Sequence, residues 1–579
     1  MRFKPNSSIF RHLIAPLASI ALWFAGASCD AQTLLGGITK VVTGNHTCAL
    51  TNSGTVKCWG LNFFGQLGDN SITNRSTPVD VISGPSLPVL SGVSAIAAGL
   101  NHTCVLIGGG VRCWGYNAKG QLGDGSTTQR LTPVDVVGLT AGVSAITTGA
   151  LHTCALTNLG GVKCWGSNAA GRLGNNSVVL ADSSTPVDVI TLPSSAPLSG
   201  VAAIEAGGEH TCAIMIGGGM KCWGQNLQGQ LGINSLPLLG ISRTPLDVLG
   251  LAGGMSAMSL GGQHTCALSI GSGLRCWGYN DPGQLGDNSA INRLLPVDVF
   301  GLTSGVAAIT AGNVHTCALT TTGGAKCWGN GNIGQLGNNS QNGSRIPGDV
   351  LGLTSNVSDI SAGNDHTCAV TSGGGVKCWG FNGYGQLGDN TDIFRLTPVD
   401  VLLPSPIALS AVKSRKTHGA AGIFDLPLDT TQAIGALVTV ESRAIGVGHL
   451  IVFQFTVPVI TAGAATAVDS VGASVAIGSV TRSGNEVLVT LTSAADNSRA
   501  KISLNGTNGA VNSTASLGFL IGDANNSRSV DSIDLSSVKA RSGQVTDLTN
   551  YRYDVNASGA VNVADILAVK ARSGLVLIP

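Results

Sequence analysis

The residues best suited to chemistry lie near the C-terminal end, in two twelve-residue segments with oxygen side chains at matching positions. Positions 1, 3, 5, 9 and 12 of each segment carry Asp, Asn or Ser, and position 7 would offer its backbone carbonyl. The candidate ligands are Asp523, Asn525, Ser527, Ser529, Asp531 and Asp534 in the first segment, and Asp554, Asn556, Ser558, Ala560, Asn562 and Asp565 in the second. Oxygen ligands at this spacing suit a hard cation, so the sequence predicts two calcium sites.

The two loops differ at the sharp turn of position 6. Loop 2 has Gly559 there, whereas loop 1 has Arg528, which strains the turn and adds positive charge. We therefore expect loop 2 to bind calcium more tightly. Each loop is followed by a helix-like run ending in Val-Lys-Ala-Arg-Ser-Gly. The alternative, a pair of polar turns between helices, does not explain two aligned copies with identical tails.

A longer repeat fills the first four hundred residues. The tripeptide His-Thr-Cys begins at His46, His102, His152, His210, His264, His315 and His366. Around each copy stand four short runs rich in β-branched and apolar residues, separated by Gly, Asn, Ser and Pro. Four strands in a unit of about fifty residues are typical of a propeller blade. Residues 37–402 are therefore predicted to form a seven-bladed β-propeller.

Each repeat holds two cysteines on either side of a predicted hairpin turn. The pairs are Cys48 and Cys58, Cys104 and Cys113, Cys154 and Cys164, Cys212 and Cys222, Cys266 and Cys276, Cys317 and Cys327, and Cys368 and Cys378. Facing positions in an antiparallel hairpin meet disulfide geometry, so we predict seven disulfides. Zinc bound by His46, Cys48 and Cys58 is an alternative, but no fourth ligand recurs. Catalytic histidines are another, but no nucleophile or base recurs beside them. We expect the histidines to fix the loop before their strand, and the tryptophan after each second cysteine to pack between blades.

The repeat pattern G-x-x-H-T-C-A-L, followed by V-x-C-W-G-x-N-x-x-G-Q-L-G, resembles the regulator of chromosome condensation repeat family from about Gly37 to Leu402. The resemblance implies a seven-bladed propeller, in agreement with the count of repeats. The family's nuclear member is a guanine-nucleotide exchange factor. We do not carry that activity over, because an exported chain would not meet a cytosolic GTPase.

Residues 520–579 resemble a type I dockerin, which has two loop–helix calcium motifs in tandem. The resemblance implies a cohesin-like protein partner, contacted through loop positions 10 and 11. Those positions are Ser532 and Ile533 in loop 1, and Val563 and Ala564 in loop 2.

Between the two repeat regions, residues 407–519 contain no cysteine and show alternating or apolar runs. Examples are Ala436–Val440, Leu450–Phe455 and Glu486–Leu491, separated by Gly, Asn and Ser clusters. This pattern predicts a β-sandwich and resembles the immunoglobulin-like modules of bacterial surface proteins. The whole chain is thus expected to be mainly β, with a propeller, a sandwich and a small α-helical module.

The N-terminal end is typical of an export signal. Arg2, Lys4 and Arg11 precede an apolar run from Leu13 to Gly26, so residues 1–31 are predicted to be a signal peptide. Lipid attachment at Cys29 is an alternative to free secretion. No other segment is expected to cross a membrane as a helix. We expect a secreted or cell-surface protein, with a periplasmic or outer-membrane location as a variant.

The charge balance and the residues that depart from the repeat limit the classes of function that the sequence supports. Lys plus Arg number 32 and Asp plus Glu 31, which gives no support for nucleic-acid binding. Glu205 and Glu209 are the glutamates of the propeller, and we read them as individual variations without a catalytic role. The leading hypothesis is a non-enzymatic binding or scaffolding protein with a protein or glycan partner. A carbohydrate-active enzyme comes second, and nucleotide exchange, by family analogy alone, comes third.

Overall fold

The computed structural model divides into two compact units, from Met1 to Pro404 and from Ser405 to Pro579, which are described separately. The predicted signal peptide, and Cys29 within it, lie outside the described residues. The structure describes residues 33–85, 87–236, 240–404, 409–418, 422–428, 439–441, 449–456, 459, 462–492, 498–507, 511–519, 530, 532–546, 550–553, 555, 558 and 560–573.

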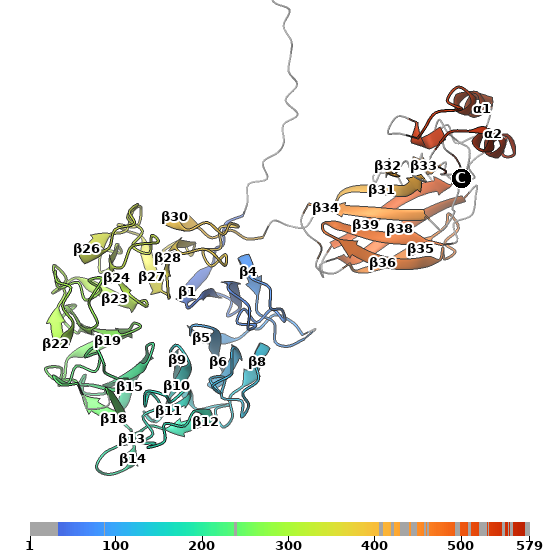
Figure 1. Cartoon of the computed structure of the whole chain (residues 1–579). Coiled ribbons are helices and arrows are strands. Elements are labelled where there is room, and N and C mark those ends of the chain that lie inside the picture. Colours follow the sequence, from blue (N-terminus) through green and yellow to red (C-terminus); the bar gives the residue numbers. More distant parts are fainter. Residues whose placement is uncertain are drawn as a thin grey trace, which may run out of the picture. The chain divides into compact units, whose positions relative to one another are not determined.

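The first unit is a ring of seven antiparallel sheets, each with four strands in sequence order (Figure 1). Blade 1 is β1 (Ile38–Thr43), β2 (His46–Thr51), β3 (Val56–Gly60) and β4 (Arg75–Asp80); blade 2 is β5 (Val93–Ala98), β6 (His102–Ile107), β7 (Gly110–Gly115) and β8 (Arg130–Asp135); blade 3 is β9 (Val143–Thr148), β10 (His152–Thr157), β11 (Val162–Gly166) and β12 (Ser183–Asp188). A short hairpin of β13 (Ile190–Thr191) and β14 (Ala196–Pro197) follows blade 3.

The remaining four blades repeat the same order. Blade 4 is β15 (Val201–Ala206), β16 (His210–Met215), β17 (Met220–Gln225) and β18 (Ile241–Asp247); blade 5 is β19 (Met255–Leu260), β20 (His264–Ser269), β21 (Leu274–Gly278) and β22 (Arg293–Asp298); blade 6 is β23 (Val306–Ala311), β24 (His315–Thr320), β25 (Ala325–Gly329) and β26 (Ser344–Asp349); blade 7 is β27 (Val357–Ala362), β28 (His366–Thr371), β29 (Val376–Gly380) and β30 (Arg395–Asp400). The predicted seven-bladed propeller is confirmed.

The second strand of each blade is buried along nearly its whole length, as in His46–Thr51, because both faces of the sheet pack against neighbouring blades. The tryptophan at the end of the third strand fills the seam. Trp114 of blade 2 packs with Leu67 and Val81 of blade 1 and is fully buried. Gly68 of blade 1 has φ of +70°, and a Cβ there would lie 2.8 Å from the Trp114 ring nitrogen. The expected packing of tryptophan between blades is confirmed, and the glycine is needed both for its φ and for this close approach.

Blades 7 and 1 are joined without a covalent linker. At other seams a linker residue bonds back to the preceding blade, as when Leu90 N donates to Val81 O at 2.8 Å. At the closing seam Leu35 N donates to Val401 O at 2.9 Å, and Leu34 pairs with Leu402. The segment before β1 therefore takes the position of a linker and closes the ring.

The second unit begins with two sheets. Their strands are β31 (Leu409–His418), β32 (Gly422–Leu428), β33 (Thr439–Glu441), β34 (His449–Phe455), β35 (Ala464–Val468), β36 (Ile477–Ser483), β37 (Glu486–Leu491), β38 (Ser498–Thr507) and β39 (Val511–Phe519). The sheet β32-β31-β34-β37-β36 and the sheet β33-β39-β38-β35 share one apolar core, which includes Phe453, Val489 and Ile502. The predicted sandwich is thus present. Of the expected strand at 436–440, the part before 439 lies outside the described residues.

The unit also contains a helical module built from α1 (Ser532–Lys539), a 3-10 turn η2 (Tyr551–Tyr553) and α2 (Val563–Lys570). Both helices stand where the sequence predicts a helix after each loop. Valines from both halves form the core, namely Val530, Val538, Val555, Val561 and Val569. Across the residues that the structure describes, no helix is long and apolar enough to span a membrane.

Candidate functional sites

The paired cysteines face each other within each blade. In blade 1, Cys48 on β2 is the register partner of Cys58 on β3, and the pair forms a disulfide with a Cα–Cα distance of 4.1 Å. The other six predicted pairs have the same arrangement. The described residues hold no group of three or more His, Cys, Asp or Glu side chains able to bind a metal ion. Nothing in this arrangement supports the zinc alternative.

The seven histidines form hydrogen bonds between blades. Each Nε2 lies 2.6–3.0 Å from a threonine Oγ1 of the next blade, in the pairs His46–Thr103, His102–Thr153, His152–Thr211, His210–Thr265, His264–Thr316, His315–Thr367 and His366–Thr47. We expected each histidine to hold the loop before its own strand. The hydrogen bonds instead join each histidine to the next blade, so the histidines hold neighbouring blades together. The sequence feature that could have predicted these bonds is the repeated His-Thr pair, because each repeat supplies one donor, the histidine, and one acceptor, the threonine, for bonds between blades.

A second contact fixes the direction of these bonds. The Thr103 hydroxyl donates to Gln66 O at 2.9 Å, and the Trp114 ring nitrogen donates to the same carbonyl at 2.9 Å. Because the single hydroxyl proton is used, Thr103 accepts from His46, and His46 carries its proton on Nε2. Burial lowers the pKa of His46 to about 3, so this imidazole is neutral at physiological pH.

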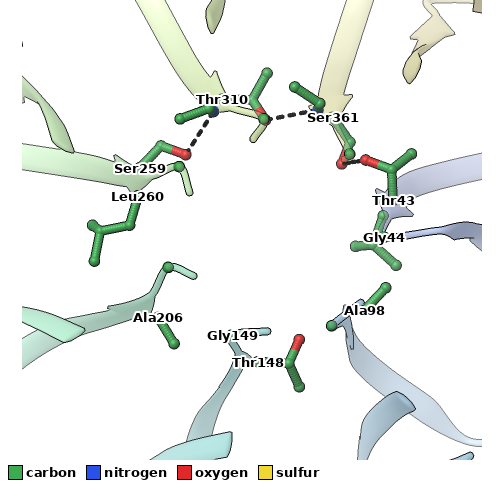
Figure 2. Close-up of a pocket in the computed structure, with 18 of the residues that line it drawn as sticks. Thr43, Gly44, Ala98, Thr148, Gly149, Ala206, Ser259, Leu260, Thr310 and Ser361 are labelled. Carbon is green, nitrogen blue, oxygen red and sulfur yellow. Dashed lines mark hydrogen bonds between the residues drawn. The ribbon is translucent and has the colours of Figure 1, made fainter. Parts of the chain in front are cut away.

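The inner strands of the seven blades surround a central channel of about 680 Å³. Figure 2 shows hydroxyl side chains around it, with Ser259, Thr310 and Ser361 on successive blades. Ser259 Oγ accepts from Ala311 N at 2.9 Å, and Thr310 Oγ1 accepts from Ala362 N at 2.9 Å. These hydroxyls link the inner strands across the seams.

Glu205 of blade 4 lines the channel. Burial raises the pKa of its carboxyl to about 7, against the opposing influences of Lys40 and a hydrogen bond from Thr147. A raised carboxyl pKa in a cavity is typical of functional sites, although structural positions also show it. Sequence reasoning gave Glu205 no role, because strand patterning alone does not reveal that this residue faces the channel.

Glu209 is held by a charged partner in the preceding blade. Its carboxylate forms an ion pair with Arg172, whose side chain is only 2% exposed. Arg172 stands where six of the seven repeats have Gln, as in Gly-Gln-Leu-Gly at Gln66. The two departures from the repeat therefore neutralise each other, which supports a structural role for Glu209.

The two calcium loops are described only in part. Asp523, Asn525, Ser527, Ser529, Asp531, Asp554 and Asn556 lie outside the described residues. Asp534 and Asp565, at position 12 of each loop, are fully buried. In loop 2, Asn562 Nδ2 lies 3.3 Å from Ser558 Oγ and 3.0 Å from Ala560 O. Positions 5, 7 and 9 thus lie close together, joined by hydrogen bonds that the Asn562 amide donates to the oxygens of Ser558 and Ala560.

Asn562 and Asp565 also cap α2. The Asn562 side chain accepts from Ala564 N at 2.7 Å, and the Asp565 side chain accepts from Asn562 N at 2.8 Å. This reciprocal capping box positions both oxygen-bearing side chains at the start of the helix. The donor set therefore fits calcium, with Asn562 engaged by the helix in a way that suits contact through water at position 9.

The four predicted docking residues occupy the first turns of the two helices and are exposed. Ser532 and Ile533 begin α1, and Val563 and Ala564 begin α2. Ile533 is 60% exposed and Val563 is 64% exposed. Two apolar side chains in water at matching positions mark a surface suited to a protein partner.

Known proteins match both repeat regions. The family model "Regulator of chromosome condensation (RCC1) repeat" matches residues 41–66, 93–121, 143–172, 201–230, 306–335 and 357–386. The chain is 31% identical over 332 residues to the ultraviolet-B receptor UVR8 of Arabidopsis thaliana, covering 56% of this chain and 72% of the receptor. The chain belongs to the RCC1-repeat family. Its residues 521–572 match the model of the dockerin type I domain.

Other relatives have different names, and the share of their length that this chain covers differs widely. The secretion-regulating guanine nucleotide exchange factor of Bos taurus is 29% identical, with 62% of this chain and 80% of that protein covered. The human probable E3 ubiquitin-protein ligase HERC4 is 33% identical, but the chain spans only 32% of its length. Yeast RCC1 (Prp20), solved bound to Kap60, has a TM-score of 0.52 at 19% identity over 70% of this chain and 94% of that one. At that identity the likeness shows the shared RCC1 fold.

Proposed function

We propose that this protein is an exported, non-enzymatic binding protein whose propeller presents a recognition surface and whose C-terminal module docks to a partner. The observation that carries the proposal is the use of the repeated polar residues. Histidines, threonines and cysteines of the repeat all serve the ring and the disulfides. What remains for recognition is the set of residues that differ between blades.

The relatives support a platform role through their diversity. A light receptor, an exchange factor and a ubiquitin ligase by name share this repeat. Activities so different point to the propeller as a shared scaffold, with the specific function added on it. Seven disulfides in one unit further suit an oxidising compartment, which agrees with the predicted export signal.

The C-terminal module would hold calcium through the two loops and dock through the first turns of α1 and α2. Calcium, when bound, supplies positive charge that draws the loop oxygens together and orders the helix starts. Ser532, Ile533, Val563 and Ala564 are the proposed contact residues, and a cohesin-like protein is the proposed partner class. Free secretion and a lipid anchor at Cys29 remain the two proposed forms of the mature chain.

The test is binding of the purified mature chain to a panel of immobilised cohesin modules, in calcium and in EDTA. We expect calcium-dependent binding that is lost when Ile533→Asp and Val563→Asp are combined. Lys539→Ala, at the exposed end of α1, serves as the matched control and should bind as the natural chain does. Absence of binding in calcium, or binding indifferent to both EDTA and the double substitution, would contradict the docking role.

A further inference from the structure

A second cavity, of about 260 Å³, lies between blade 7 and blade 1. Blade 7 contributes Asn364, Asp365, Phe381, Tyr384 and Gln386, and blade 1 contributes Asn45. The volume is slightly below the roughly 300–1,000 Å³ of typical small-molecule sites. It therefore suits one ring-sized unit of a ligand rather than a large cofactor.

The aromatic residues of this cavity are not required by the blade. Phe381 follows the Trp-Gly of its repeat, and the same position holds Ser167, Gln225 and Asn330 in blades 3, 4 and 6, but Tyr116 and Tyr279 in blades 2 and 5. Tyr384 precedes the Gly-Gln of its repeat, and the same position holds Lys119, Ala170 and Gln228 in blades 2, 3 and 4, but Phe64 in blade 1. Small and polar side chains fit both positions, and of the seven repeats only the seventh carries a ring at both, so this pair of rings calls for another explanation.

The rings also gather at this side of the propeller. Tyr384 contacts Phe381 with ring centroids 5.8 Å apart, and it contacts Phe63 of blade 1 at 5.9 Å, both edge to face. Phe63 is 56% exposed and Tyr384 is 37% exposed. Exposed aromatic side chains that contact each other across a seam form an apolar patch, and such patches mark ligand sites.

Polar groups with unused hydrogen-bonding capacity stand beside the rings. Gln386 is only 2% exposed, and its Oε1 accepts from Tyr384 N at 3.0 Å, but within the described residues its Nε2 makes no hydrogen bond. Asn364 donates to Asp365 Oδ2 at 2.7 Å, and Asn45 donates to Asn101 at 3.1 Å. Gln386 lines the cavity, so its unengaged amide nitrogen is available to donate to a group bound there.

We propose that this seam cavity binds one uncharged sugar unit of a glycan. The inference rests on the proposed function of the propeller as a binding module and names its ligand class. Sugar hydroxyls both donate and accept, as the amides of Asn45, Asn364 and Gln386 do, and the Asp365 carboxylate adds a further acceptor. The apolar C–H face of a sugar ring packs on Phe381 or Tyr384. No Lys or Arg lines the cavity, so an acidic sugar would lack a counter-charge.

A quaternary ammonium ligand is the competing occupant, since aromatic rings and a carboxylate attract cations. Such a ligand can neither donate nor accept a hydrogen bond, so the amides of Asn45, Asn364 and Gln386 would gain no partner from it. The amide set therefore favours the sugar, and the ammonium becomes an outcome of the test.

The test is calorimetric titration of the full mature chain with cellohexaose, xylohexaose, mannohexaose, laminarihexaose and chitohexaose, and separately with tetramethylammonium. Two variants disturb the cavity. Tyr384→Ala removes the exposed ring, and Asp365→Leu installs the residue type that blade 3 carries at Leu151. Tyr279→Ala in blade 5, at the position equivalent to Phe381, is the matched control.

We expect at least one oligosaccharide to bind, with a loss of about tenfold or more in affinity in both cavity variants, as when an anchoring aromatic is truncated. The control should bind unchanged, and near-ultraviolet circular dichroism of the buried tryptophans should show that each variant is folded. Binding of no sugar, equal sugar binding by natural chain and variants, or binding of tetramethylammonium alone would overturn the proposal. Those results leave cohesin docking untouched, because that test depends on α1 and α2.

Discussion

His46 in blade 1 donates from Nε2 to the Oγ1 of Thr103 in blade 2 across 2.6 Å, and the series of such bonds ends where His366 in blade 7 reaches Thr47 in blade 1. Each blade therefore gives one of these bonds and receives one. All of these histidines are buried. The stability of the whole ring is thus tied to the protonation state of the imidazoles.

Acid should weaken the propeller in a defined window. Burial lowers the histidine pKa to about 3 for His210, against 6.5 when unfolded, so the unfolded chain binds more protons below pH 6.5. Stability is therefore full above pH 6.5 and is lost as pH falls toward 3, by up to about 1.4 kcal/mol per pH unit for each histidine. Guanidinium unfolding midpoints measured from pH 8 to pH 5 should fall steeply below pH 6.5.

The control for this effect is His210→Gln, which keeps an amide donor near Thr265 but cannot titrate. As pH falls, its free energy of unfolding should decrease less steeply than that of the natural chain. The difference in slope should correspond to the uptake of about one proton fewer on unfolding. Between pH 5 and 6.5, Asp124, Asp287 and Asp389 do not interfere, because their pKa values are lowered and they titrate below this window. Glu205 contributes here with the opposite sign, but it does so equally in both chains and cancels in the comparison. An unchanged slope would show that the imidazole is not the titrating group.

Each disulfide should stabilise its blade independently. The bond between Cys266 and Cys276 closes a loop with a sequence separation of 10, for which chain entropy predicts about 2–3 kcal/mol. Replacing both residues with Ala should lower the free energy of unfolding by that amount. Thiol titration and mass spectrometry of a non-reduced digest would check the pairing. Free thiols in several blades, or bound zinc in proportion to the chain, would contradict it.

The pair of Arg172 and Glu209 offers a compensated exchange. Glu209→Gln leaves the buried guanidinium without its counter-charge and should destabilise the chain by about 2–3 kcal/mol. This is less than the roughly 3–5 kcal/mol for breaking a fully buried pair, because the Glu209 side chain is 33% exposed. The double variant Arg172→Gln with Glu209→Asn recreates the Gln66 and Asn101 combination of the blade 1–2 seam, whose side chains meet at 3.5 Å. It should recover most of the loss in a urea unfolding series. A double variant as unstable as the single one would argue against compensation.

Glu205 should show the opposite pH dependence to the histidines. Its folded pKa of about 7 exceeds the ordinary 4.5, so its contribution is full below pH 4.5 and is lost as pH rises through 7. Glu205→Gln should therefore raise stability at pH 8, by up to about 3 kcal/mol and less where channel water solvates the carboxylate, with no gain at pH 4.5. Thermal unfolding at the two pH values compares them. Equal effects at both would show that the carboxyl titrates normally.

Calcium uptake should occur in two events of different strength. Calorimetry on the full mature chain should lose the tighter event in Asp554→Ala and the weaker event in Asp523→Ala. The physical reason is the turn at position 6, where Gly559 accepts the required backbone and Arg528 does not. Ser542→Ala, after α1, is the control. No uptake at millimolar calcium, or uptake insensitive to both substitutions, would refute the assignment.

The repeat made most of the propeller predictable. The recurrence of His-Thr-Cys set the number of blades, and the spacing of Cys48 and Cys58 about one turn placed them in register. Two helices after two loops followed from the identical tails. In each case the determining contacts are local or repeated, so one sequence contains them several times.

What sequence reasoning missed depends on contacts between distant residues. The partner of His46 lies 57 positions away in the sequence. Which strands of neighbouring blades come into contact is decided only when the blades assemble into a closed ring. Glu205 appeared as a variation because nothing local shows that its strand position faces the channel. Phe63 and Tyr384 are more than three hundred residues apart in sequence, so their contact across the closing seam was not foreseeable from spacing.

The closing seam also has a thermodynamic consequence. A linear stack of repeats has two terminal units that fray, whereas a closed ring has none. Here the ring closes without a peptide linker, and this seam carries an ion pair between Lys40 and Asp359 at 2.8 Å, with Asp359 also accepting from Val41 N at 3.0 Å. The ion pair thus joins blades 7 and 1 at the one seam where the ring could open without breaking a covalent bond. A protease that needs a frayed end would therefore act only after this ion pair and the hydrogen bonds of Leu35 with Val401 and of His366 with Thr47 have all broken.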